Sequence, residues 1–333
     1  MAGPQAERDR AWWRERSAGR PQVRSLTEQQ AAAAPAALRH RIELSADRTA
    51  PVLAAARAAR ATWAEAAHAA LAAYLHRITG TREAVVGMHL MARTAPGTLR
   101  VPGMAVNILP LHLPVAPADS FDALLRRAAA ELRDVRAHQL HRGEELRREL
   151  GLVGGDERLY GPLLNIKPFD LDLDFAGSAG HTVNLASGPV DDFSLSVAKT
   201  PDHRLLLDFE ANPALYTAAE LARHAERSTA LLERLAAAPA APLGELELLP
   251  DAERAELLEH WNATAHPVEP GTLATRIAAR AAATPDATAV IAPDGTLSYA
   301  QLAAKADELA RVLAAAGPAR TGSSPSPCPA PPG

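Results

Sequence analysis

The sequence contains almost no cysteine. The single cysteine among the 333 residues, Cys328, lies in a tail rich in serine and proline. A disulfide needs two cysteines and a thiolate zinc site needs several, so the sequence excludes both within this chain. Such a composition suits the reducing cytoplasm, and we expect the protein there.

Long apolar runs and an excess of positive charge are also missing. No run approaches the roughly 20 apolar residues that a membrane-spanning helix needs, and the charged N-terminus has no signal-peptide core. The net charge is −4, from 35 Lys and Arg against 39 Asp and Glu. We therefore expect neither nucleic acid nor a membrane as a partner. The hydrophobic content of 47% indicates a globular protein with a buried core.

The common catalytic motifs are absent. The sequence has no Walker A loop, no dinucleotide-binding glycine pattern, no G-x-S-x-G elbow and no H-E-x-x-H pair. The string "GGDE" at 154–157 resembles the diguanylate cyclase signature, but four residues with two glycines occur readily by chance. The residues alone therefore identify no active site.

Two groups of residues have metal-ligand chemistry, and both favour a simpler interpretation. His138 and His141 lie near Glu144 and Glu145, but their surroundings are rich in arginine, which favours a solvated helical face. Three aspartates alternate with apolar residues, as on the polar face of a half-buried strand rather than in a calcium site: Asp170, Asp172 and Asp174. We expect no bound metal.

Hydrophobic periodicity predicts helices that alternate with strands. Helical spacing predicts helices at 8–20, 50–60, 63–79, 120–140, 217–237 and 251–264. Apolar or alternating runs predict strands at 39–48, 83–92, 102–115, 162–175, 181–187, 192–200 and 203–212. Ser120 is a predicted N-cap, and Trp12 and Trp13 are predicted packing anchors. The predicted class is mixed α/β.

Composition also predicts domain boundaries. Residues 1–245 form one predicted unit, which a proline-rich linker at 246–262 follows. Residues 263–317 then read as helix, strand, Asp-Gly hairpin, strand and helix. The tail at 318–333 has no apolar period, which is typical of a disordered segment.

Three strings, in this order and spacing, resemble the condensation domain of non-ribosomal peptide synthetases, especially of the siderophore type. They are "VPGMAVNILPLHLPV", "RLYGPLLNIKPFDLDLDF" and "LASGPVDDFSLSV". The resemblance covers about residues 8–245. It implies a fold of two chloramphenicol-acetyltransferase-like lobes in a V, which joins thioester-bound substrates by an amide bond.

The family's catalytic His-His-x-x-x-Asp-Gly motif is not in this sequence, because no two of its twelve histidines are adjacent. In the family that motif lies in the first lobe, so the resemblance implies that this chain carries the second, C-terminal lobe only. It implies as partners the missing N-terminal lobe and peptidyl or acyl carrier proteins. No cofactor is expected on the chain itself, since the phosphopantetheine is carried by those partners.

The resemblance assigns five residues to the cleft between the lobes and no catalytic residue. They match the family's motifs in "AVNILPL", "GPLLNI" and "GPVDD", and we interpret them as scaffold residues: Asn107, Pro162, Asn165, Asp191 and Asp192. For Asn107, a polar residue in an apolar strand, a structural role and a substrate contact both stay open. The family's usual arginine before the proline segment is Tyr160 here.

Beyond residue 248 the sequence resembles the junction into an adenylation domain. "LSYAQL" at 297–302 matches the first core motif of that family, through Leu297, Tyr299 and Leu302. The nucleotide-binding and catalytic motifs of the family are absent from this chain, so ATP binding is not expected. The resemblance implies the N-terminal beginning of an adenylate-forming domain.

Three functions fit these observations. The first is the condensation step of a peptide synthetase, which would be inactive unless another polypeptide supplies the histidine lobe. The second is a non-catalytic module that docks carrier proteins, and the third is a non-functional gene fragment. Upstream DNA that encodes the histidine motif in a compatible frame would separate the first from the third.

The tail has a second interpretation besides disorder. When its codons are read from each third base, Ser323, Ser324 and Ser326 become codons for Phe, Leu, Ile or Val, and Cys328 becomes Leu, Met or Val. This apolar pattern suits the strand that follows the corresponding helix in adenylation domains. The hypothesis is a frameshift near codon 317, which resequencing would test.

Overall fold

The computed structural model describes residues 4–93, 98–154, 157–168, 173–180, 188–267, 271–293 and 295–315. The predictions for 181–187, for Asp170, Asp172 and the side chain of Asp174, and for the tail fall outside this description. The chain divides into two compact units, Met1–Trp261 and Asn262–Gly333. The predicted linker at 246–262 thus lies almost wholly within the first unit.

The first unit is built on a six-stranded mixed sheet in the order β1-β8-β7-β4-β2-β3. The β4 strand is parallel to β7 and β2, and the other neighbours are antiparallel. The strands are β1 (Leu38–Leu44), β2 (Glu83–Leu90), β3 (Asn107–Pro114), β4 (Leu163–Lys167), β7 (Phe193–Lys199) and β8 (Leu205–Ala211). A small hairpin of β5 (Leu173–Phe175) and β6 (Ser178–Gly180) follows β4.

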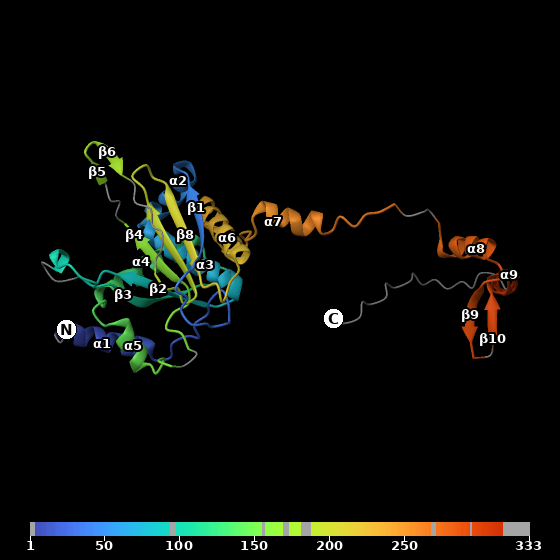
Figure 1. The fold of residues 1–333 in the computed structure, drawn as a ribbon, viewed down its shortest axis with the longest axis horizontal. Helices are drawn as coiled ribbons and strands as arrows, with labels where there is room; N and C mark the ends of the chain where they lie inside the picture. The colour runs from blue at the N-terminus through green and yellow to red at the C-terminus, as the bar shows by residue number, and fades with distance from the viewer. Residues whose placement is uncertain are drawn as a thin grey trace. The chain divides into compact units, whose positions relative to one another are not determined.

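Four long helices pack against one face of this sheet (Figure 1). They are α2 (Ala46–Ala58), α3 (Trp63–Thr79), α4 (Phe121–Ala137) and α6 (Ala218–Ala237). Shorter elements complete the unit: α1 (Pro4–Ser17), the turn η1 (Thr98–Arg100), α5 (Gly143–Glu149), and α7 (Asp251–Ala255), which continues as a π turn, η2 (Glu256–His260). The mixed α/β class predicted from the sequence is confirmed.

Local capping explains where the long helices begin. The Thr62 and Thr217 side chains accept hydrogen bonds from the backbone N–H groups of Glu65 and Glu220, and each glutamate accepts one in return. Ser120 accepts a hydrogen bond from the N–H of Ala123 at 3.2 Å, which confirms it as an N-cap. None of the helices in the described ranges has the length and hydrophobicity that a membrane crossing requires.

The core lies between the sheet and the four helices. Its largest fully buried side chains include Trp13, Tyr74, Phe121 and Phe209. Trp13 donates from Nε1 to the His138 carbonyl at 2.9 Å, and Trp12 stacks on the His138 ring at 4.3 Å. The two tryptophans therefore anchor α1 on the end of α4, as predicted.

One core position is expected to gain stability from a single substitution. The hydroxyl of Thr229 on α6 is buried beside an apolar cavity of about 30 Å³ and has no partner among the described residues. Valine has the same shape without the hydroxyl, so Thr229→Val is expected to raise the free energy of unfolding by about 1 kcal/mol. Urea denaturation measures this. The matched control is Ser228→Ala, which removes a hydroxyl that donates to the Ala225 carbonyl and is expected to bring no gain.

A buried histidine makes the first unit sensitive to acid. His68 on α3 is 1% exposed, donates from Nδ1 to the Ala64 carbonyl at 2.8 Å, and has a pKa that burial lowers to about 4. Between pH 6.5 and 4 the unfolded chain therefore binds a proton that the folded chain does not, and the free energy of unfolding falls as the pH falls. We expect a loss of about 3 kcal/mol from this group across the window.

Urea denaturation at several pH values checks this expectation. Burial also lowers the pKa of His89, His141 and His224, so these groups act in the same direction. His68→Asn keeps a hydrogen-bond donor but does not titrate, and it should flatten the pH dependence whatever its effect on absolute stability. An unchanged slope in this variant would contradict the assignment.

The second unit contains α8 (Leu273–Ala283), β9 (Thr288–Ala292), β10 (Gly295–Ser298) and α9 (Tyr299–Ala315). This is the predicted order of helix, strand, strand and helix. Within the described part of this unit only Ala281 is buried. Large apolar side chains are exposed on three of its elements: Leu273, Ile277, Ile291, Leu309, Val312 and Leu313.

Candidate functional site

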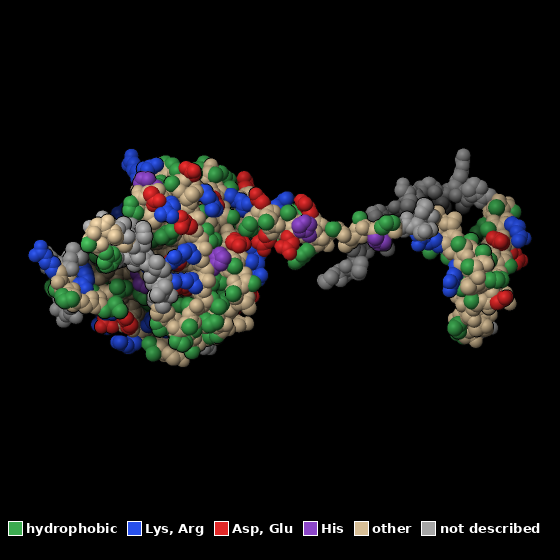
Figure 2. Space-filling model, turned by 45° about the horizontal axis from the view of Figure 1, so that its top comes forward, with side chains coloured by type: hydrophobic (Ala, Val, Ile, Leu, Met, Phe, Trp, Pro, Cys, Tyr) green, Lys and Arg blue, Asp and Glu red, His purple; other side chains and the backbone are tan. Residues whose placement is uncertain are grey.

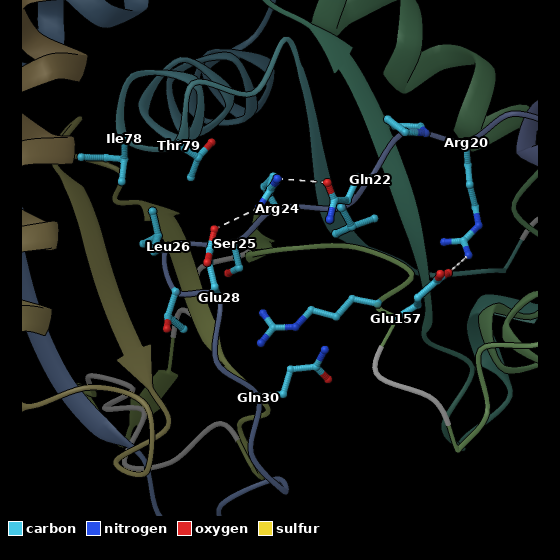
Figure 3. Close-up of a pocket in the computed structure, with 14 residues that line it drawn as sticks. Arg20, Gln22, Arg24, Ser25, Leu26, Glu28, Gln30, Ile78, Thr79 and Glu157 are labelled. Atoms are coloured by element: carbon cyan, nitrogen blue, oxygen red, sulfur yellow. Dashed lines mark hydrogen bonds and ion pairs between the residues drawn. The ribbon is translucent and has the colours of Figure 1, made fainter.

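A cavity of the first unit is lined mainly by the segment that joins α1 to β1. It has a volume of about 840 Å³ and is lined by this segment together with the end of α3 and residues before β4 (Figure 3). Its lining residues are Arg20, Pro21, Gln22, Val23, Arg24, Ser25, Leu26, Thr27, Glu28, Gln30, Ile78, Thr79, Glu157 and Arg158. The first part of the segment that joins α1 to β1, residues 20–36, is called the crossing segment below.

Asp192, at the start of β7, holds the wall of this cavity. Its buried carboxylate accepts hydrogen bonds from the Ser25 hydroxyl and the Arg158 guanidinium through Oδ2, and from the Tyr216 hydroxyl at 2.7 Å through Oδ1. Burial, and then the nearby Asp192 charge, raise the pKa of Tyr216. Tyr216 therefore stays a neutral donor, and one carboxylate joins three segments that are distant in the sequence.

Further contacts fix the crossing segment along its length. Arg158 donates to the Gln29 carbonyl at 2.6 Å, and Asn212 donates from Nδ2 to the Ala32 carbonyl at 2.9 Å. Ala34 and Val190 exchange backbone hydrogen bonds at 3.0 and 3.1 Å. The segment is thus held by side chains and one isolated backbone bridge rather than by a regular sheet ladder.

The charged side chains that line the cavity are paired with one another or with Asp192. Arg24 contacts Gln22 and Glu28, each at 3.0 Å, and Arg20 pairs with Glu157 (Figure 3). The described lining includes no histidine, cysteine or lysine, which are the side chains that most readily act as base or nucleophile near pH 7. In the described ranges no three His, Cys, Asp or Glu side chains are placed to hold a metal.

Asn107 lies at the start of β3 and does not line this cavity. Both polar atoms of its side chain are hydrogen-bonded to backbone groups. Its Nδ2 donates to the carbonyls of Gln139 and His141 at 2.9 and 2.7 Å, and its Oδ1 accepts from the N–H of Gly143 at 2.9 Å. It is 1% exposed. These bonds fix the start of β3 to the connection between α4 and α5. A Cβ at Gly143 would collide with the Ile108 carbonyl, so the approach also requires glycine there.

The other predicted cleft residues lie on or beside the central strands. Pro162 is buried, and its carbonyl accepts from the N–H of Gly87 at 2.9 Å. Asn165 is half-buried on β4, opposite Ser196 of β7, and alternation places it on the face away from Leu164 and the core. Asp191 is exposed, and its carbonyl accepts from Nδ2 of Asn212 at 3.1 Å. None of the five predicted residues lines the cavity itself, but Asp192 is hydrogen-bonded to two residues that do, Ser25 and Arg158.

The prediction of a solvated face holds for Glu144 and Glu145, which are exposed, but it is wrong for His141. His141 is only 3% exposed, because it lies between α1 and α5, with ring nitrogens 3.7 Å from carboxylate oxygens of Glu145 and Glu149. Burial lowers its pKa, against the opposing effect of these two carboxylates. The amphipathic pattern of α4 ends before this residue, so the sequence showed no reason for its burial.

The residues of the predicted adenylation motif lie in the second unit. Leu297 is on β10, opposite Val290 of β9, and Tyr299 and Leu302 are on α9. The motif forms the corner where β10 turns into α9. Around this corner the side chain of Gln301 and the backbone of Ser298 are hydrogen-bonded at 2.9 Å.

Sequence reasoning did not identify the residues that bind Asp192. Ser25, Arg158 and Tyr216 show no shared motif or spacing, and they lie 167, 34 and 24 residues from it. The sequence pattern marked only Asp192 itself, as one of two acidic residues directly before an apolar strand.

Comparisons with known proteins all lead to one family. The family described as "Condensation domain" matches residues 1–258. A dimodular nonribosomal peptide synthase of Bacillus subtilis is 37% identical over 310 residues, which cover 93% of this chain and 13% of that protein. An isonitrile lipopeptide synthase of Streptomyces coeruleorubidus is 39% identical, covering 92% and 21%. Enterobactin synthase component F of Escherichia coli O157:H7 is 35% identical, covering 73% and 19%.

Solved structures agree with this result. The first condensation domain of the calcium-dependent antibiotic synthetase, in complex with a substrate analogue, is 37% identical with a TM-score of 0.69. The starter condensation domain of rhizomide synthetase is 35% identical with a TM-score of 0.62. This chain covers 55% and 56% of those chains. With the family matched over most of its length, the chain belongs to the condensation-domain family of nonribosomal peptide synthetases.

Proposed function

We propose that the first unit is the C-terminal lobe of a condensation domain and forms one wall of the site where an amide bond is made. The observation that carries the proposal is the family match over residues 1–258, together with a single six-stranded sheet in that unit. The chain spans about half of the solved condensation domains that it resembles. The substrates would be aminoacyl or acyl thioesters on phosphopantetheine arms of carrier proteins, as in a siderophore-type synthetase.

The reaction needs a positioned amine and a base. The acceptor amine attacks the donor thioester carbonyl, a C–N bond forms, the C–S bond breaks, and the proton leaves the amine for the departing thiolate. The sequence has no His-His pair to assist this transfer. We therefore assign this lobe the positioning of substrates and the exclusion of water, and assign the base to a histidine-bearing lobe outside this sequence.

The second unit is proposed to be the beginning of an adenylate-forming domain. Its exposed apolar side chains support this assignment, because a hairpin and two helices whose described residues include one buried side chain do not provide a stable core. Further polypeptide of such a domain would cover these side chains. No ATP binding is proposed for this chain.

Co-expression with the histidine-bearing lobe of a related synthetase tests the function. Loaded donor and acceptor carrier proteins are mixed with the two lobes, and mass spectrometry follows the amide product. Product with both lobes and none with either alone is expected. Carrier binding without product would favour the docking module, and neither binding nor product would favour a non-functional fragment.

A further inference from the structure

The last part of the first unit is strongly acidic. Residues 243–256, called the strap below, contain five carboxylates and a single arginine: Glu245, Glu247, Asp251, Glu253 and Glu256, with Arg254. Figure 2 shows acidic side chains gathered over α7, at the end of the strap. Arginines of α3 and α6 approach the strap from the helical layer, so the two surfaces have complementary charge.

Arg77 of α3 holds the start of the strap. Its Nη1 donates to the carbonyls of Leu243 and Leu246, at 2.5 and 2.7 Å. Leu243 is buried, and its N–H donates to the Asp119 carbonyl at 2.8 Å. This end of the strap is therefore fixed by both packing and hydrogen bonds.

Arg234 of α6 holds the middle. Its Nη1 donates to the carbonyls of Glu247 and Leu249 at 3.1 and 2.8 Å, and its Nη2 donates to Asp251 Oδ1 at 2.9 Å. One guanidinium thus satisfies two backbone carbonyls and a side chain at the first turn of α7. Such fork geometry is specific to arginine.

Arg227, also on α6, holds the far end. It donates from Nε to Glu253 at 2.9 Å and from Nη2 to the other oxygen of the same carboxylate. The hydrogen bond from Arg227 lowers the pKa of Glu253, against a smaller effect of burial. The two side chains are 23% and 19% exposed, so solvent and salt still reach the pair.

No residue of the strap after Leu248 is buried. None of the residues of α7 and η2 is buried, and a five-residue helix is not stable by itself. Leu249, Pro250 and Ala255 are half-buried, and the polar contacts to α6 are made by Arg227 and Arg234. This part of the strap is thus retained by interactions that can open without disrupting the core.

We propose that the strap is an electrostatic catch, that is, a segment held on the first unit by arginine contacts from which it can detach reversibly. While it is attached, the connection to the second unit starts after the strap. When it detaches, that connection becomes longer. Closed, the strap fixes the chain as far as Glu253. When the strap opens, residues 247–256 are freed, and they can span up to ~35 Å when extended. The catch goes beyond the proposed function and does not depend on it, because it concerns only how far the second unit reaches from the first.

Hydrogen exchange on the full chain tests whether these arginines hold the strap. In Arg227→Met with Arg234→Met, amide exchange within 247–256 is expected to be at least tenfold faster, with unchanged exchange in β2, β7 and β8. The matched control is Arg48→Met, since Arg48 makes the same two-pronged contact to Glu233 of α6, at 2.6 and 2.8 Å, without touching the strap. Unchanged exchange within 247–256 in the double variant would overturn the proposal, as would equal acceleration in the control.

Two further measurements keep the test decisive. Glu253→Gln with Asp251→Asn removes the two carboxylate charges but leaves the Arg234 bonds to the Glu247 and Leu249 carbonyls. It should accelerate the same amides to a smaller extent, which keeps the test available if the arginine variants fold poorly. Spin labels at Glu226→Cys and Lys305→Cys, in a Cys328→Ser background, report the distance between the units. Faster exchange without a shift to longer distances would overturn the claim that opening lengthens the connection.

Discussion

Replacement of Asp192 by alanine is expected to destabilise the first unit by about 3–5 kcal/mol. The carboxylate is 7% exposed and is the shared acceptor for Ser25, Arg158 and Tyr216. Its removal leaves a guanidinium and two hydroxyl groups in a poorly solvated place without that acceptor. Ser25 and Arg158 also fix the crossing segment. In Asp192→Ala the backbone amides of the crossing segment should therefore exchange faster, even while the rest of the unit stays folded.

Urea denaturation followed by tryptophan fluorescence measures the loss, since Trp13 is fully buried in this unit. Asp191 provides a matched control, because it is the adjacent aspartate but is exposed. Asp191→Ala is expected to change the free energy of unfolding by less than about 0.5 kcal/mol. Equal effects of the two substitutions would show that Asp192 is not the hub of the cavity wall.

The sequence was most informative where structure is set locally. The helix predicted at 63–79 coincides with α3, because its apolar spacing lies within the segment and the flanking Thr62 and left-handed Gly80 cap its two ends. The strand predicted at 102–115 is shorter, as β3 begins only at Asn107. Arg93 donates to the carbonyls of Val101 and Gly103 at 2.9 and 2.6 Å and holds the chain out of the sheet there. No periodicity reports such a contact.

The site was less predictable than the fold. The resemblance selected Asp192, but the partners that explain its burial come from three other segments of the chain. The strap shows the same limit. A proline-rich composition predicted a linker at 246–262, whereas arginines on α3 and α6 hold much of that segment on the first unit. Arginine on an exposed helical face is typical of any solvated helix. The sequence therefore did not indicate that these arginines bind residues 246–253.

Asn107 is the residue for which the sequence left two roles open, and one substitution separates them. Asn107→Ala removes the partners of two carbonyls and one N–H, at Gln139, His141 and Gly143. We expect the free energy of unfolding to fall by about 3 kcal/mol, since each buried group left unpaired costs about 1 kcal/mol or more. Asn165→Ala is the matched control, and because Asn165 is only half-buried it should cost less than about 1 kcal/mol.

The complementation assay completes the separation of the two roles. If Asn107 only fixes the start of β3 to the connection between α4 and α5, amide formation by Asn107→Ala should fall in proportion to the folded fraction. It should recover when lower temperature restores the fold. A loss of product in fully folded protein, with stability unchanged, would instead assign Asn107 to the substrate. The geometry favours the first result, because both hydrogen-bonding atoms of the amide are already engaged by the backbone within 3 Å.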